Sequence, residues 1–385
     1  MLSYSFSLRE IGFGYFFANV LLFLSCGNSH VIESDVKEIP VDFSQKVISF
    51  PLSELAEDIT AIELELTNES MLKQGGDVFI YDNNLIIVQN HGIFLFEMNG
   101  KFVRTIGSKG QGPGEYLSNN IVTVDEEKNR LYVYSRGKII CYDLIGKNYI
   151  TESTLIQSKK IDIIDMNYIN NELLIIGSCF IQDEKGHHQH LAIYRLNDEL
   201  QITDSCAIRD DYTNLFFTID NSFGINLYKT DSTVYFYYPK NNFDTDPDKK
   251  VLLDILYRYE NNQLIPDIKL NIKNRMRWSS DEDFYLYNIH KTSRYVFVAY
   301  NMYYAFCYDM KTGLNYNVLI FEPQQGSSYM SRNGDLIENA KGGDQRRSIS
   351  AVNNNPNLFY YLHTNMDPDV LEEPNPTLYL INLKK

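Results

Sequence analysis

The chain has 385 residues, of which 44% are hydrophobic and 14% aromatic, so it can bury a large core and is too apolar for intrinsic disorder. Its formal net charge of −15 argues against nucleic acid as a partner, because binding to a phosphate backbone needs clustered Lys and Arg. The 29 Tyr and 22 Phe, together with the lack of sustained helical periodicity, favour sheets over helices.

The N-terminus carries a 14-residue apolar run, residues 11–24, directly before Ser25-Cys26-Gly27. The run is too short for a comfortable membrane span and fits the core of a signal peptide. A small residue before Cys at this place resembles the lipobox of bacterial lipoproteins. That resemblance implies cleavage after residue 25, a lipid on Cys26 and attachment to a membrane through it. An uncleaved anchor or a different translation start are the alternatives.

Residues 26–45 are polar and lack a strand pattern, so we expect a tether between the lipid and the folded domain. The sequence therefore predicts three parts: a signal peptide over 1–25, a tether over 26–45 and a folded domain over 46–385.

Six short apolar strand cores recur along the folded domain, beginning at residues 85, 131, 173, 234, 295 and 358. A unit of about 40–60 residues built from strands is typical of a propeller blade. An Asn99-Gly100 turn between apolar runs indicates a hairpin in the first unit. In the first two units the strands are predicted at 78–81, 85–88, 92–96, 102–106, 121–124, 131–134 and 139–142.

The sixth unit has no fourth strand after its third strand at 378–381, whereas an N-terminal strand, at 47–52 or 62–66, has no unit of its own. Open sheet edges are costly, so we expect the N-terminal strand to complete the last unit. The predicted fold class is an all-β, six-bladed β-propeller whose last blade is closed by the N-terminal strand. A linear arrangement of two β domains is the competing fold.

The segment GSKGQGPGEY, residues 107–116, connects the first two units. It resembles the connector of NHL-type propellers and, more closely, the signature of six-bladed β-propeller lipoproteins of gut Bacteroidetes. The leader with Cys26 and the Leu52-Ser53-Glu54-Leu55 stretch fit that family, which implies a fold but no assigned reaction. A phosphate-binding loop is disfavoured, because no Gly-Lys-Ser/Thr opens a helix here.

His187, His188 and His190 are close in sequence, in what we interpret as a hairpin loop between second and third strands. No Cys-x-x-Cys or Cys/His spacing for a metal is present. We therefore expect no metal ion, no other cofactor and no catalytic residue.

Four cysteines remain after the lipidation site, namely Cys141, Cys179, Cys206 and Cys307. The strand assignment places them in different blades or two strands apart, beyond the reach of a disulfide. They are predicted to be thiols.

Arg275, Arg277 and Trp278 lie before the fifth unit, and Arg346 lies in the loop after Gly342-Gly343 before the sixth. Arg and aromatic side chains dominate binding hot spots, so these four are candidate ligand-binding residues. Packing of Trp278 against a neighbouring blade is the alternative.

The sequence thus predicts a lipid-anchored propeller of the cell envelope, an outer-membrane or periplasmic lipoprotein that binds or scaffolds a peptide, glycan or protein. One alternative is a metal-assisted lyase or hydrolase acting at the channel mouth. Another is a structural component of an envelope complex.

Overall fold

Strands dominate the described residues of the computed structural model, and these residues include one four-residue helix, α1 (Leu52–Leu55). The structure describes residues 36–45, 47–48, 52–73, 75–118, 121–146, 149–154, 160–183, 186–212, 226–239, 254–273, 286–300, 304–319, 336–339, 346–352, 355–363 and 374–385. In these ranges no helix is long and apolar enough to cross a membrane.

Six sheets follow one another along the chain, and each contains four antiparallel strands that are consecutive in the sequence. Blade 1 consists of β4 (Asp77–Tyr81), β5 (Asn84–Gln89), β6 (Gly92–Glu97) and β7 (Phe102–Thr105). Blade 2 consists of β10 (Ile121–Asp125), β11 (Arg130–Ser135), β12 (Lys138–Asp143) and β13 (Tyr149–Ser153). Blade 3 consists of β14 (Asp162–Ile169), β15 (Glu172–Asp183), β16 (Gly186–Leu196) and β17 (Ile202–Tyr212).

The last three sheets each gain a strand from the N-terminal part of the chain. Blade 4 consists of β18 (Asn226–Thr230), β19 (Thr233–Tyr237), β20 (Ile255–Glu260), β21 (Gln263–Lys273) and β1 (Lys37–Asp42). Blade 5 consists of β22 (Leu286–Lys291), β23 (Tyr295–Tyr300), β24 (Tyr304–Asp309), β25 (Asn315–Leu319) and β2 (Val47–Ile48). Blade 6 consists of β26 (Leu336–Asn339), β27 (Arg346–Val352), β28 (Asn355–His363), β29 (Thr377–Leu383) and β3 (Ala56–Glu63).

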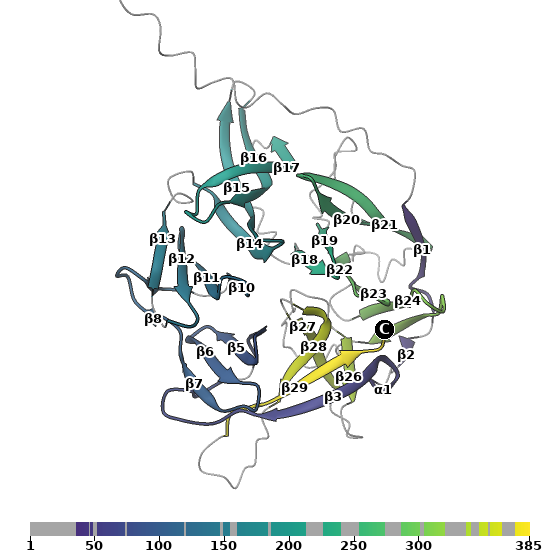
Figure 1. Cartoon of the computed structure of the whole chain (residues 1–385). Coiled ribbons are helices and arrows are strands. Elements are labelled where there is room, and N and C mark those ends of the chain that lie inside the picture. The colour runs from purple at the N-terminus through teal and green to yellow at the C-terminus, as the bar shows by residue number, and fades with distance from the viewer. Residues whose placement is uncertain are drawn as a thin grey trace, which may run out of the picture. The chain divides into compact units, whose positions relative to one another are not determined.

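Six buried hydrophobic clusters hold the sheets together, one between each pair of neighbouring blades. Ile86 and Val133 share the cluster between blades 1 and 2, and Ile87 and Leu380 share the one between blades 6 and 1. Successive side chains of a strand point to opposite faces, so each blade packs on both sides. The clusters close a ring of six blades (Figure 1), which confirms the predicted six-bladed propeller.

The N-terminal part of the chain closes the last blade. Strand β3 pairs antiparallel with β29, so the prediction that residues within 46–66 complete the sixth blade is confirmed. The strand begins between the two segments suggested by the sequence and overlaps the second of them at residues 62–63. Gly100 at the blade 1 turn has a φ of 89°, and a Cβ there would lie 1.9 Å from the Glu63 carbonyl oxygen. Only glycine allows this turn to approach the closing strand.

The N-terminal chain also lies along the outer edges of two further blades. Strand β1 pairs parallel with β21, and β2 pairs parallel with β25. We call residues 37–48 the strap. The predicted tether over 26–45 is therefore wrong for residues 37–42, because Ile39 and Val41 alternate with exposed residues and are fully buried. Their partner strand lies more than 220 residues away, so no local sequence pattern indicates this pairing.

Contacts from blade 5 fix the turn between the two strap strands. The rings of Phe43 and Tyr300 have centroids 4.0 Å apart. The Asn317 amide donates hydrogen bonds of 3.1 Å to the carbonyls of Asp42 and Gln45. Asn317 is itself buried, so removal of the strap would leave its amide without these acceptors.

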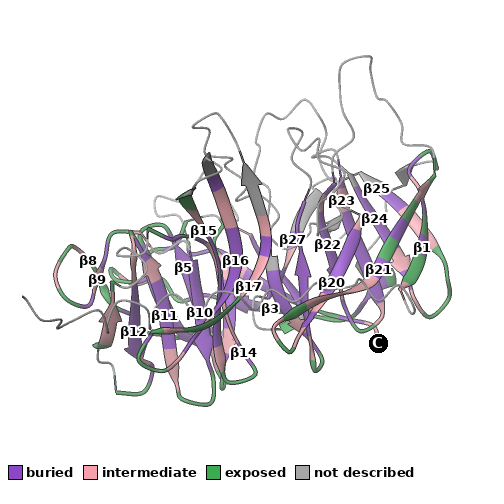
Figure 2. Cartoon of the chain, turned by 90° about the horizontal axis from the view of Figure 1, so that it is seen from above, coloured by how far each residue is buried: buried purple, intermediate pink, exposed green. Residues whose placement is uncertain are grey.

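The propeller has two unlike faces. The turn face carries the tight turns that join first to second and third to fourth strands, such as 82–83, 292–294 and 310–314. The connector face carries the opposite strand ends, including those from which the chain crosses to the next blade. Figure 1 looks onto the turn face, and Figure 2 shows the exposed turns along its lower edge.

Candidate functional site

The candidate ligand-binding residues fall mostly outside the described residues. Arg275, Arg277 and Trp278 lie there, and so does the predicted lipidation site, Cys26. In the sequence, Arg275, Arg277 and Trp278 follow the end of β21 at Lys273 and precede the start of β22 at Leu286. Both of these strand ends are described and lie on the connector face.

Arg346 is the first residue of β27 and lies opposite Asn339 of β26. Its predicted place in a loop is therefore wrong. The added strand β26 pairs with the first half of β27 and draws Arg346 into the sheet.

The glycine-rich segment 107–116 is a packed connector between blades 1 and 2. Its two ends, β8 (Ser108–Lys109) and β9 (Glu115–Tyr116), pair parallel with each other. The Gly112 N–H donates to the Glu115 carboxylate at 2.8 Å, and the Tyr142 hydroxyl donates to the Gly114 carbonyl at 2.8 Å. The connector interpretation is supported, because a backbone N–H that a phosphate would need is already engaged by a carboxylate.

A polar network joins blades 4 and 5 at the turn face. Lys291, the last residue of β22, reaches across to blade 4, where its Nζ donates to the Tyr235 hydroxyl at 2.7 Å and to Asp267 Oδ2 at 2.9 Å. Asp267 Oδ1 also forms an ion pair with Arg258 Nε at 3.1 Å.

The charged groups of this network neutralise one another through ion pairs and hydrogen bonds. Burial disfavours the charged amine of Lys291, but the hydrogen bonds to Tyr235 and Asp267 outweigh burial and raise its pKa above the ordinary value. A lysine with a raised pKa is a poor nucleophile or general base near neutral pH. The network therefore binds blade to blade rather than offering a reactive group.

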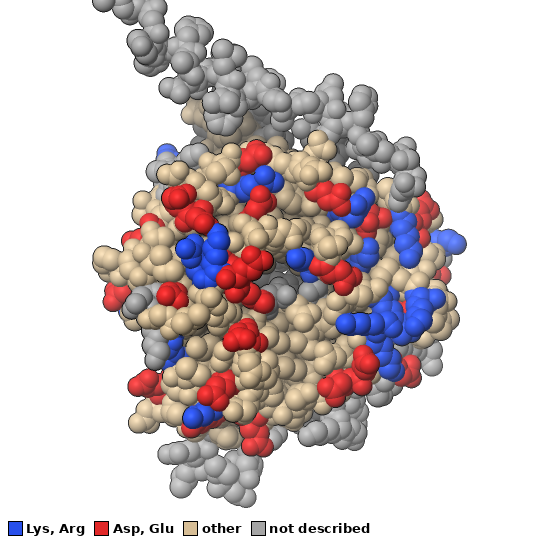
Figure 3. Space-filling view, in the orientation of Figure 1, with Lys and Arg blue, Asp and Glu red and all other residues tan. Residues whose placement is uncertain are grey.

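Further polar contacts between blades follow around the middle of the turn face. Ser293 Oγ donates to Asp231 at 3.0 Å, and the Ser293 N–H donates to Asn357 Oδ1 at 2.8 Å, which links blades 4, 5 and 6 in series. Lys128 and Asp198 form an ion pair of 2.5 Å between blades 2 and 3. Charged side chains of both signs surround the central opening of this face (Figure 3).

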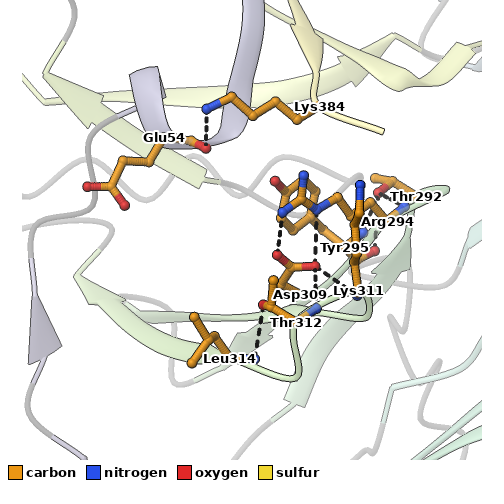
Figure 4. Close-up of polar contacts among 9 residues, drawn as sticks. All are labelled: Glu54, Thr292, Arg294, Tyr295, Asp309, Lys311, Thr312, Leu314 and Lys384. Carbon is orange, nitrogen blue, oxygen red and sulfur yellow. Dashed lines mark hydrogen bonds and ion pairs between the residues drawn. The ribbon is translucent and has the colours of Figure 1, made fainter.

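Blade 5 carries a second charge cluster, which ties its two turns together (Figure 4). Arg294 donates to both carboxylate oxygens of Asp309, at 3.1 Å from Nε and 2.6 Å from NH2. The Lys311 N–H adds a hydrogen bond of 2.9 Å to Asp309 Oδ1. The hydrogen bonds from Arg294 outweigh the effect of burial and lower the pKa of Asp309 to about 2.

The histidines of blade 3 lie in a strand and not in a loop. His187, His188 and His190 are residues of β16, which has 11 residues and, like β15 and β17, is longer than every strand of blades 1 and 2. The loop interpretation is therefore wrong, because the hairpin pairs as far as Asp183 and Gly186. In the part of the chain that the structure describes, no group of three His, Cys, Asp or Glu side chains could hold a metal ion.

The cysteines occupy the strands that the sequence predicted. Cys141 and Cys307 lie in third strands of different blades, whereas Cys179 and Cys206 lie in the second and fourth strands of blade 3. All four are thiols in the structure, which confirms the prediction. Burial raises the pKa of the Cys141 thiol to about 11, so it is unreactive at neutral pH.

Sequence reasoning missed the turn-face networks around Lys291 and Arg294. Both residues stand at the end of an inner strand or in the turn after it, a position that recurs in every blade. This recurring position would have indicated that such a residue lies near a neighbouring blade. Nothing in the sequence identifies the residues on other strands with which it pairs.

The chain belongs to the family described as a domain of unknown function, DUF4934, whose model matches residues 36–383. The match begins one residue before β1, in agreement with the place of the strap in the fold. No curated protein matches the chain.

Among solved structures, a protein of Bacteroides fragilis described as exported is similar, with 17% identity and a TM-score of 0.54 over 91% of this chain and 100% of that one. The Pan2 WD40 domain of Neurospora crassa has 8% identity and a TM-score of 0.41, over 91% of this chain and 90% of that one. At such identities the likeness of the first structure concerns the fold alone.

Proposed function

We propose that the protein is a lipid-anchored propeller of the cell envelope that binds or scaffolds a peptide, glycan or protein partner on its connector face. In this proposal Arg275, Arg277, Trp278 and Arg346 contribute to the partner site, and Cys26 carries the lipid. No catalytic step is part of the proposal.

The difference between the two faces carries this proposal. On the turn face, described charged groups at the inner turns take part in contacts between blades, as for Lys291 with Asp267 and Asp231 with Ser293. The candidate residues between Lys273 and Leu286 follow a strand end on the opposite face. A propeller gathers segments from six blades around one axis, which is a favourable place for a ligand.

The proposed location outside the cytoplasm has two supports. The chain carries an apolar run before Ser25-Cys26, and the similar protein from Bacteroides fragilis is described as exported. The test is fatty-acid labelling of the chain and of its Cys26→Ser variant. Labelling should vanish in the variant, and label that persists, or a mature N-terminus elsewhere, would contradict the lipid anchor.

The partner is tested by capture of the full-length protein from envelope extracts, with a metal assay on the same sample. We expect a specific partner that is recovered unchanged. If the protein instead cleaves a glycan or peptide, and a chelator stops the cleavage, the protein is a metal-assisted lyase or hydrolase and the binding proposal fails.

A further inference from the structure

We infer that the outer edge of blade 3 receives an extended segment of the partner protein, which pairs with β17 as a fifth strand. The inference rests on the proposed function, because it requires a polypeptide partner, and it narrows the partner to one that offers such a segment. Strand β17 lies on the outer side of the ring, where blades 3 and 4 meet (Figure 1).

The six outer edges of the propeller differ in how they are protected from further pairing. The outer strands of blades 4, 5 and 6 are each paired with an N-terminal strand, β1, β2 or β3. The outer strands of blades 1 and 2, β7 and β13, have only four and five residues, and short edges resist added strands. Strand β17 has 11 residues, and in the described part of the chain it pairs with β16 alone. A long open edge of this kind is a template for an added strand.

The backbone of β17 directs hydrogen-bonding groups outward along this edge. The Ser205 carbonyl accepts a hydrogen bond of 3.0 Å from the side-chain amide of Asn262 in blade 4, so it points away from β16. In an antiparallel strand the N–H and C=O of one residue point to the same side, and the side alternates along the strand. The register is regular from Ser205 to Ala207, so the N–H and carbonyl of Ala207 also point outward. These groups match the backbone of an extended polypeptide.

The N-terminal strands of blades 4 and 6 show what a fifth strand does in this propeller. Ile39 and Val41 of β1 are fully buried in the hydrophobic cluster between blades 4 and 5. Ile62 of β3 is equally part of the cluster between blades 6 and 1 and is 6% exposed. In both blades the fifth strand therefore contributes apolar side chains to the cluster that its blade shares with the next one.

The cluster between blades 3 and 4 has no fifth strand over it among the described residues. Two of its members on outer strands, Cys206 of β17 and Leu264 of β21, are only half-buried. A strand paired with β17 would place every second side chain on the same face of the sheet as Cys206. Apolar side chains there would complete this cluster, as Ile39 and Val41 complete the next one. The occupant is therefore an extended segment with apolar residues two positions apart.

The test uses the full-length protein and synthetic peptides of about ten residues, a length that suits strand pairing, with Val or Ile at every second position and polar residues between them. Matched peptides contain the same residues without the alternation. Calorimetry measures binding, and amide hydrogen exchange locates the site. We expect the alternating peptides to bind about five-fold or more tightly than the matched ones and to slow exchange in residues 203–209 of β17.

Variants at Ala207 test the backbone contact itself. Ala207→Pro removes an outward N–H, a change that edge strands tolerate, and should weaken binding of the alternating peptides by about five-fold or more. Ala207→Ser keeps this N–H and should bind them like the parent. If Ala207→Pro melts early, N-methylated peptides supply the same test: methyl groups on one set of alternate residues should abolish binding, and methyl groups on the other set should not.

Equal binding of alternating and matched peptides, or protection of another segment instead of β17, would overturn the inference. Slow exchange of the Ala207 amide in the free protein would also overturn it, because another part of the chain would then cover the edge. A dimer of the parent that Ala207→Pro dissociates would assign the edge to a second copy instead.

Partner capture keeps this inference distinguishable from the proposed function. A captured partner that binds Ala207→Pro and Ala207→Ser equally well overturns the inference and leaves the binding function in place. Peptides that pair with β17 while the parent captures no partner overturn the binding function and leave β17 as an edge that accepts strands.

Discussion

Blades 1 to 3 and blades 4 to 6 are completed in different ways. The first three are four-stranded sheets made from continuous stretches of chain, whereas the last three have outer edges paired with β1, β2 and β3. In the first half, each sheet depends on neighbours in sequence. In the second half, each outer edge depends on residues 37–63, more than 200 positions away. The integrity of the ring therefore rests on one N-terminal segment.

Deletion of residues 46–66 should have the largest effect, because it removes β3 and leaves β29 as an open edge. We expect aggregation or failure to fold, measured by size-exclusion chromatography and thermal melting. A deletion variant that melts like the parent would refute this account of ring closure.

Ile39→Ala should destabilise the protein by about 2–5 kcal/mol, because it opens a cavity at a fully buried site beneath the strap. The matched change Ile150→Ala lies in the outer strand of blade 2, where the side chain is 42% exposed, and should cost less than about 0.5 kcal/mol. Urea unfolding measures both. Equal effects would mean that the strap does not contribute to the stability of blade 4.

The Arg294–Asp309 pair should make stability depend on pH in acid. The folded pKa of Asp309 is about 2 against an ordinary value of 3.8, so its contribution is present above about pH 4 and is lost as the pH falls through 2. The shift corresponds to about 2 kcal/mol.

The free energies of unfolding of the parent and the Asp309→Asn variant should therefore converge as the pH falls from 4 to 2. Glu199→Gln, at an exposed turn of blade 3, serves as the control and should follow the parent at every pH. A constant difference between parent and Asp309→Asn over this range would exclude the ion pair as the cause.

We expect the smallest effect from the thiols, since the four cysteines that the structure describes form no disulfide. A reducing agent should leave the melting temperature unchanged. Alkylation under denaturing, non-reducing conditions should label Cys141, Cys179, Cys206 and Cys307, and a linked peptide pair on mass spectrometry would contradict the strand positions.

The same contrast between the two halves explains what the sequence could predict. The strands of blade 1 were predictable to within a residue or two, because apolar alternation and the Asn99-Gly100 turn are local signals. Strand β1 was missed, because only two of its residues are buried and its partner is remote. The placement of Arg346 failed for a similar reason, since β26 and β27 pair without a strong apolar pattern.

The networks of the turn face also could not be predicted, since Lys291 and Asp267 meet across two blades. The candidate ligand-binding residues came from residue type alone, and three of the four lie outside the described residues. They therefore remain a prediction for the connector face.

The central claim is that a partner binds at the connector face, and the affinity of the captured partner for Trp278→Ala tests it most directly. We predict a loss of about 1–3 kcal/mol in binding, measured by calorimetry, with an unchanged melting temperature. The turn-face variant Lys101→Gln should bind like the parent. If Trp278→Ala unfolds, Trp278 is a packing residue and not a binding residue. If Trp278→Ala binds the partner with unchanged affinity, and Lys101→Gln binds it more weakly than the parent, the claim is contradicted.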